Sequence, residues 1–127
     1  SSDLGVEMKT LSALAEKITT LPGDKKFFNK TLRLFEERKK MVAENRLDWA
    51  MGELIAYGTL LNEGYPVRFT GQDVERGTFS HRHAVIQMED SEEQFTPLNH
   101  VAPGKQAPFR IYNSLLSLFC LKCFLKV

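Results

Sequence analysis

The chain is poor in several residue types, and each shortage excludes a class of protein. Its 127 residues include two cysteines and one tryptophan. Two cysteines cannot build a disulfide framework, so we expect a reducing, intracellular setting. No run of about 18 apolar residues occurs, which argues against a transmembrane helix. The first residues also lack the basic and apolar regions of a secretory signal peptide. The net charge of +1 gives no electrostatic reason to expect a nucleic acid or an anionic membrane as partner.

Carboxylates are absent after Glu93. Residues 1–46 carry ten Lys and Arg against seven Asp and Glu, residues 47–93 carry three against nine, and residues 94–127 carry four against none. The end of the chain is therefore either a functional basic segment or sequence that does not belong to a normal folded unit. A hydrophobic content of 43% is enough for a modest core in a chain of at most one ordinary domain.

Residues 1–46 are predicted to form a helical hairpin with a short connection. The apolar residues of its first helix recur at spacings of three and four: Met8, Leu11, Leu14, Ala15 and Ile18. Pro22 and Gly23 are expected to end that helix, and Asp24 is expected to cap the second one. The second helix has one apolar face, made by Phe28, Leu32, Phe35 and Val42. Its charged residues are interpreted as a solvated face.

Residues 47–64 predict a different kind of helix. Asp48 is a suitable N-cap and Gly64 a suitable residue just beyond the C-terminus. Residues 49–61 are apolar on nearly all sides, which is typical of a helix buried in a larger body. Glu53 is the one charge in its middle, and two interpretations remain open: an edge carboxylate that reaches solvent, or a buried functional acid.

The next residues predict strands separated by a polar loop. Residues 67–70 and 84–88 alternate as strands do, and residues 109–112 are a further short strand. Loop 71–83, between the first two, is dense in ionisable and hydrogen-bonding groups. Because ligands of open α/β sheets bind outside the carboxyl ends of strands, this loop is the expected place for chemistry. Residues 97–108 read as a loop, and Asn113 and Ser114 as the start of a helix.

Two pairs of residues in the chain could suggest metal or redox chemistry. His81 and His83 at spacing i, i+2 leave three alternatives: metal ligands lacking a third partner, acid–base groups, or structural residues bonded to nearby carbonyls. Cys120 and Cys123 form a C-x-x-C pair without the flanking strand or the second pair that a redox or metal role requires.

Four stretches carry a resemblance to a known family. They are residues 48–58, 67–85, 95–98 and 111–114. Their residues and their order resemble the decarboxylating component of 2-oxoglutarate dehydrogenase. The resemblance to that family is close and extends from about residue 8 to residue 117. The run from Gly71 to Val85 is the most specific part. From Leu118 onward no match remains.

The resemblance implies an α/β fold class. Residues 1–46 would be a helical lead-in, and residues 47–117 the N-terminal part of a transketolase-like pyrimidine-binding domain, an incomplete three-layer α/β unit. Residues 118–127 would be an aberrant apolar tail. Leu118 stands where the family has a glutamate that bonds to the aminopyrimidine ring, and a frameshifted or truncated reading frame would explain both this break and the loss of carboxylates.

The resemblance also implies a chemistry. The family uses thiamine diphosphate as an electron sink for the oxidative decarboxylation of 2-oxoglutarate, a reaction of the tricarboxylic acid cycle. The succinyl unit passes to a lipoyl group on a succinyltransferase component. The family is homodimeric and occurs in the bacterial cytoplasm or the mitochondrial matrix. Its magnesium ligands lie outside this segment, so no metal ligand is expected here, and the 127-residue chain alone is not expected to be active.

The site residues follow from the same resemblance. Gln72 matches a glutamine beside cofactor and substrate, His81 and His83 match a histidine-containing catalytic stretch, and Leu116 matches a leucine against the cofactor. Two alternatives stay open: a catalytically dead remnant or helical interaction module, and a relative acting on 2-oxoadipate or as a plain 2-oxo acid decarboxylase.

Overall fold

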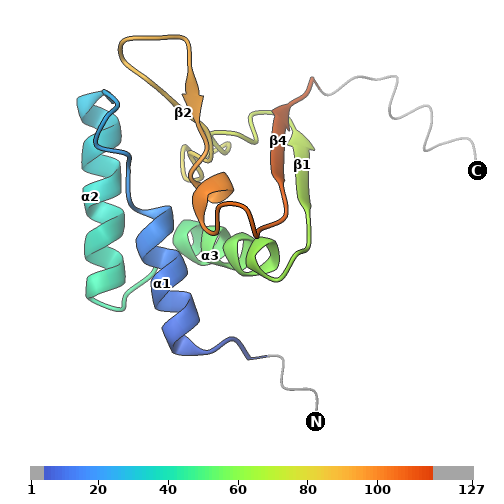
Figure 1. Cartoon of the computed structure of the whole chain (residues 1–127). Coiled ribbons are helices and arrows are strands. Elements are labelled where there is room, and N and C mark those ends of the chain that lie inside the picture. The colour runs from blue at the N-terminus through green and yellow to red at the C-terminus, as the bar shows by residue number, and fades with distance from the viewer. Residues whose placement is uncertain (1–4, 116–127) are drawn as a thin grey trace, which may run out of the picture.

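A computed structural model describes residues 5–115 of the chain. In chain order its elements are α1 (Met8–Ile18), α2 (Asn29–Ala43), α3 (Trp49–Asn62), β1 (Val67–Gly71), β2 (Ile86–Gln87), β3 (Gln94–Phe95), the 3-10 helix η1 (Pro97–His100) and β4 (Phe109–Asn113). Helices α1 and α2 lie on one side of α3 and the β1–β4 pair on the other (Figure 1). The three helices and the small parallel sheet make a mixed α/β fold, as the sequence predicted.

The parallel pair of β1 and β4 forms one wall of the main core. Its register aligns Val67 with Phe109 and Phe69 with Ile111. Parallel pairing is favourable where the strands are covered by helices, and here α3 packs against β1. The fully or nearly fully buried side chains of this core come from α1, α3, η1 and β4 and include Ile18, Met51, Leu61, Leu98 and Phe109.

Helix α3 begins and ends where its sequence predicts. The Asp48 carboxylate accepts a hydrogen bond from the Met51 amide at 2.8 Å. At the other end Gly64 has φ +92°, and the Tyr65 amide bonds to the Leu60 carbonyl at 2.9 Å, which closes a Schellman motif.

Burial of α3 on nearly all sides is not found among the described residues. One face is buried, through Ala50, Met51, Leu54, Ile55, Gly58 and Leu61. Trp49 at the first position is 96% exposed, and Leu60 is 41% exposed. The helix packs against α1, η1 and β1.

The predicted start of α2 at Asp24 is wrong. The helix begins at Asn29, and its N-cap position, Phe28, makes no side-chain cap. The preceding residue, Phe27, is 5% exposed and pairs with Met88 in an isolated β-bridge. Phe27 packs in a second core cluster with Phe35, Ile86, Met88 and Phe95. Burying an aromatic side chain in that cluster outweighs an additional helical turn.

Two further predictions need correction. The strand expected over 84–88 is reduced to β2, which pairs with β3 across the acidic turn. The expected loop over 97–108 contains η1, where Leu98 is 1% exposed. Leu116, Leu118, Cys120 and Cys123, with the tail 118–127, lie outside the described residues. No helix between residues 5 and 115 combines the length and the apolarity needed to cross a membrane.

Candidate functional site

Loop 71–83 starts where the two parallel strands end. The Ser114 amide bonds to the Gly71 carbonyl at 2.8 Å, and the Glu75 amide bonds to the Asn113 side-chain oxygen at 3.1 Å. The carboxyl ends of β1 and β4 are thereby joined to the loop. Gln72 follows directly and is exposed at this edge, which is where parallel sheets present ligand-binding groups.

The loop is folded tightly on itself. Five backbone hydrogen bonds of 2.8 to 3.1 Å hold it together. The amides of Gly77 and Ser80 donate to the carbonyls of Asp73 and Gly77, respectively. The amides of Arg82 and His83 both donate to the Arg76 carbonyl, and the Ala84 amide donates to the Glu75 carbonyl. Three residues other than glycine have positive φ, namely Asp73 (52°), Ser80 (53°) and His83 (43°). Such conformations cost about 1 kcal/mol or more each and persist only where surrounding contacts enforce them.

Arg82 supplies one set of those contacts, on the side of the loop that faces α3. Its side chain is 10% exposed. Its Nη2 and Nε donate to the Glu53 carboxylate at 2.9 and 3.2 Å, and its Nη1 donates to the Val74 carbonyl at 2.7 Å. The guanidinium also lies over the Phe69 ring, 4.7 Å from its centre. One arginine thus connects α3, β1 and both ends of the loop.

Glu53 is neither a simple edge carboxylate nor an isolated buried acid. Its side chain is 25% exposed, and it accepts hydrogen bonds from Arg82 and from the Tyr57 hydroxyl at 2.7 Å. Burial opposes its ionisation, but the hydrogen bonds from Tyr57 and Arg82 outweigh burial and hold the pKa of Glu53 below its usual range. Burial and the bond to Glu53 raise the pKa of Tyr57 to about 12. Glu53 and Arg82 therefore form an ion pair near neutral pH.

His81 is turned toward this ionic contact. Its Nε2 lies 4.0 Å from a Glu53 oxygen. Its Nδ1 is buried without a hydrogen-bond partner. The ring covers Gly77 so closely that a Cβ on that residue would lie 2.6 Å from the ring's Cε1. The glycine at φ +84° is what permits this approach.

His83 faces the opposite way, toward α2. Its Nε2 lies 2.7 Å from the Ser80 carbonyl, and because a carbonyl only accepts, Nε2 carries the proton and Nδ1 is the basic nitrogen. Burial lowers the pKa of His83, and the positive charges of Arg38, Lys30 and Arg76 lower it further, against the Ser80 bond. His83 is therefore neutral near pH 7.

A groove of about 580 Å³ lies beside His83. It is lined by Ser80 and His83 from the loop and by Asn29, Lys30, Thr31, Arg33, Leu34 and Glu37 from α2. His83 lines this groove, whereas His81 does not.

The structure thus separates the two histidines that the sequence places two residues apart. Within residues 5–115 no cluster of three or more His, Cys, Asp and Glu side chains is arranged to hold a metal ion. Gln72 lies at the strand ends, His81 on the α3 side and His83 on the α2 side of one loop.

Sequence reasoning missed Arg38, on α2. Arg38 is 3% exposed, and its Nη2 donates to the Arg82 carbonyl at 2.7 Å and to the His81 carbonyl at 3.3 Å. Burial lowers the pKa of Arg38, while the charge of Asp48 raises it. The signal was its position: Arg38 falls between Phe35 and Val42 on the apolar face of the helix.

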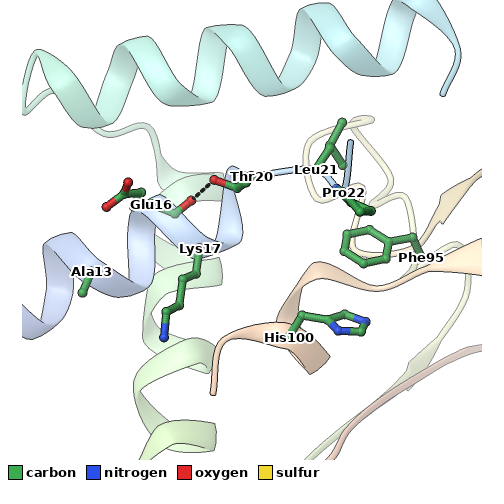
Figure 2. A pocket seen from close by; sticks show the side chains of 8 residues that line it. All are labelled: Ala13, Glu16, Lys17, Thr20, Leu21, Pro22, Phe95 and His100. Carbon is green, nitrogen blue, oxygen red and sulfur yellow. Dashed lines mark hydrogen bonds between the residues drawn. The ribbon is translucent and has the colours of Figure 1, made fainter. Parts of the chain in front are cut away.

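A second cavity, of about 500 Å³, lies elsewhere in the fold (Figure 2). It is formed by the end of α1, the segment after it, β3 and η1, and the rings of Phe95 and His100 stack at 4.8 Å in its wall. Lys17 and Glu16 stand at its rim, and the Thr20 hydroxyl donates to the Glu16 carbonyl at 2.7 Å. No motif of the sequence points to it.

Comparison with known proteins gives one consistent result. The chain is 41% identical over 118 residues to the 2-oxoglutarate dehydrogenase E1 component of Bacillus cereus strain AH187, and 40% identical over 116 residues to that of Bacillus anthracis strain A0248. These matches cover 92% and 91% of this chain, but the chain spans about 12% of the length of these relatives. No family model matches. The resemblance deduced from the residues is confirmed: by sequence, this chain corresponds to a segment of the 2-oxoglutarate dehydrogenase E1 components.

Proposed function

We propose that residues 8–117 serve as part of the active site of a thiamine-diphosphate-dependent decarboxylating component, with 2-oxoglutarate as substrate. One observation carries this proposal: the most specific stretch of the resemblance, residues 71–85, coincides with the loop at the carboxyl ends of the parallel strands. The wider setting would be a transketolase-like pyrimidine-binding domain in a homodimer that hands the succinyl unit to a lipoyl-bearing succinyltransferase.

The loop residues fit the neutral, aminopyrimidine side of such a cofactor. Gln72 offers an uncharged donor and acceptor at the strand ends, and His83 is a neutral imidazole with Nδ1 as acceptor. Asp73, which follows Gln72 in the chain, is paired with Arg76 at 2.6 Å, and Glu37 lines the groove beside His83. In this proposal the magnesium ligands lie outside this segment, as the resemblance implies.

Each residue has a role in this proposal. Gln72 orients a substrate oxygen without adding charge. His83 accepts or returns a proton at Nδ1, whereas His81 supports the loop against Glu53 and Gly77. Leu116 would pack against the cofactor. When bound, thiamine diphosphate supplies the electron sink for loss of carbon dioxide.

A chimeric enzyme tests the proposal. Residues 8–117 replace the matching segment of the Bacillus cereus E1 component, and 2-oxoglutarate-dependent reduction of an artificial electron acceptor is measured. We expect an active chimera in which Q72A and H83Q lower kcat by about 100-fold, the usual contribution of a positioned acid–base group. The matched controls are Q87A and H100Q, which change the same residue types on exposed positions outside the loop. The proposal fails if Q72A and H83Q match these controls.

Two further measurements test the activity of the chain alone and the choice of substrate. The 127-residue chain alone should show no decarboxylation and no tight binding of thiamine diphosphate in calorimetry. Turnover by that chain would contradict this expectation. Running the chimera with 2-oxoadipate in place of 2-oxoglutarate distinguishes the related substrate.

A further inference from the structure

We propose that Arg38 is a positioning residue that sets the direction of the His83 imidazole. The proposal rests on the function assigned to His83 above, but its central evidence is the geometry of one peptide bond. Arg38 lies on α2, outside the stretches that carry the family's most specific motif.

The peptide that joins Arg82 to His83 is held at both of its polar atoms. Its carbonyl oxygen accepts from Arg38 Nη2 at 2.7 Å, and its amide donates to the Arg76 carbonyl at 3.1 Å. The same Nη2 reaches the preceding carbonyl, that of His81, at 3.3 Å. This peptide plane therefore has little freedom to rotate.

Rotation of that plane is what would relax His83. His83 has φ 43°, in the left-handed region that histidine adopts only when contacts enforce it. If the Arg82 carbonyl were released, φ of His83 would return to negative values and the ring would leave the Ser80 carbonyl. Arg38 thus sets the direction of the His83 ring through hydrogen bonds to the backbone, in addition to the effect of its charge on the pKa of His83.

The surroundings of Arg38 suit a donor held in a fixed direction. The side chain is 3% exposed and its guanidinium lies 5.4 Å from the centre of the Phe35 ring. No carboxylate forms an ion pair with it among residues 5–115. Within the described residues its hydrogen-bond acceptors are carbonyl oxygens, so the planar donors of the guanidinium fix the direction of the backbone there.

Nuclear magnetic resonance of the full 127-residue chain tests the proposal directly. The sequence has three histidines, so long-range ¹H–¹⁵N spectra report each ring separately, with His100 as internal reference. In the unaltered chain, His83 should show a single pattern with the proton on Nε2. In R38Q this pattern should be lost to tautomer averaging while His100 is unchanged. K40Q, an exposed neighbour on α2, is the matched control and should leave both rings unchanged.

Two outcomes would overturn the proposal. One is a His83 pattern in R38Q that equals that of K40Q. If R38Q does not fold, R38Q/H83G decides the matter, because glycine adopts φ 43° without strain. We then expect the double variant to recover folding, and failure to recover would show that Arg38 is a general core residue.

The chimera separates this proposal from the function on which it rests. There R38Q should lower kcat about tenfold and change KM less than twofold, with partial recovery in R38K, whose single ammonium can reach one carbonyl. If H83Q has no effect on kcat, the assigned function is wrong, while the spectra still judge whether Arg38 positions His83.

Discussion

The two sides of loop 71–83 are held by the same kind of residue in different ways. On the α3 side, Arg82 meets the carboxylate of Glu53 at 2.9 Å, and His81 closes over Gly77. On the α2 side, Arg38 meets carbonyl oxygens, and His83 lines a groove with Lys30 and Arg33. The α3 side is a packed ion pair, whereas the α2 side has a groove whose charged lining residues are Lys30, Arg33 and Glu37.

This difference shows how a loop can be rigid and still present a reactive group. A paired, largely buried ion contact is costly to break, because the remaining charge has no partner. A buried donor to carbonyls holds backbone direction without filling the space in front of it. The neutral His83 beside several cations is the result on the α2 side.

The variant with the greatest predicted loss of stability removes the contact between Arg82 and Glu53 on the α3 side. R82M removes the donors to Glu53 and Val74 and leaves a partly buried carboxylate whose remaining hydrogen-bond donor is the Tyr57 hydroxyl, with the His81 ring 4.0 Å away. We expect a loss of about 3 kcal/mol in the free energy of unfolding, measured by urea denaturation. R68M, at an exposed arginine of β1, is the control and should change little.

A double variant sharpens this result. In E53Q/R82M no charge is left unpaired, so its loss should be smaller than the sum of the two single losses. Strict additivity would mean that Arg82 and Glu53 do not stabilise each other.

A smaller effect is expected at Gly77. G77A places a methyl group 2.6 Å from the His81 ring and forces alanine to φ +84°, so we expect a loss of about 2 kcal/mol. G52A is the matched control: no heavy atom lies within 4 Å of its new methyl group, and in a helix interior alanine should stabilise by up to about 1 kcal/mol. Opposite signs in urea unfolding support the close contact of His81 with Gly77.

The cap of α3 should have a more modest effect. D48A removes the hydrogen bond to the Met51 amide and a negative charge that raises the pKa of Arg38, with an expected loss of about 1 kcal/mol. D48N keeps a side-chain acceptor and should recover most of the cap energy. Equal losses in the two variants would assign the effect to charge instead of capping.

The smallest effect is expected in the pH dependence of stability, through His83 on the α2 side of the loop. Because the pKa of folded His83 is lowered from 6.5, its contribution to stability is present above that value and is lost as the pH falls below it. Glu53, with a pKa lowered from 4.5, contributes a slope only at more acid pH. Between about pH 7.5 and about pH 5.5, H83Q should therefore reduce the loss of stability, measured by urea denaturation. An equal loss in H83Q and in the unaltered chain would contradict this expectation.

Prediction from the sequence succeeded where the determining contacts are local. The apolar spacing from Met8 to Ile18 is readable because it repeats within one helix, and the Asp48 cap and Gly64 are readable because their hydrogen-bond partners lie within about one turn. It failed at Asp24, because Phe27 packs against Met88, far along the chain. It also failed for Arg38, whose acceptors lie 43 and 44 residues away.

The α/β class, three helices and the strands β1 and β4 could all be predicted from the amino-acid sequence. The same is true of the position of loop 71–83 and of the family resemblance that suggests the function of this loop. The tertiary structure alone decided that His81 and His83 face opposite helices, and that two arginines are buried around them. The physical reason is that periodicity records which side chains avoid water, while the direction of a loop side chain depends on non-local carbonyl and carboxylate partners that no spacing encodes.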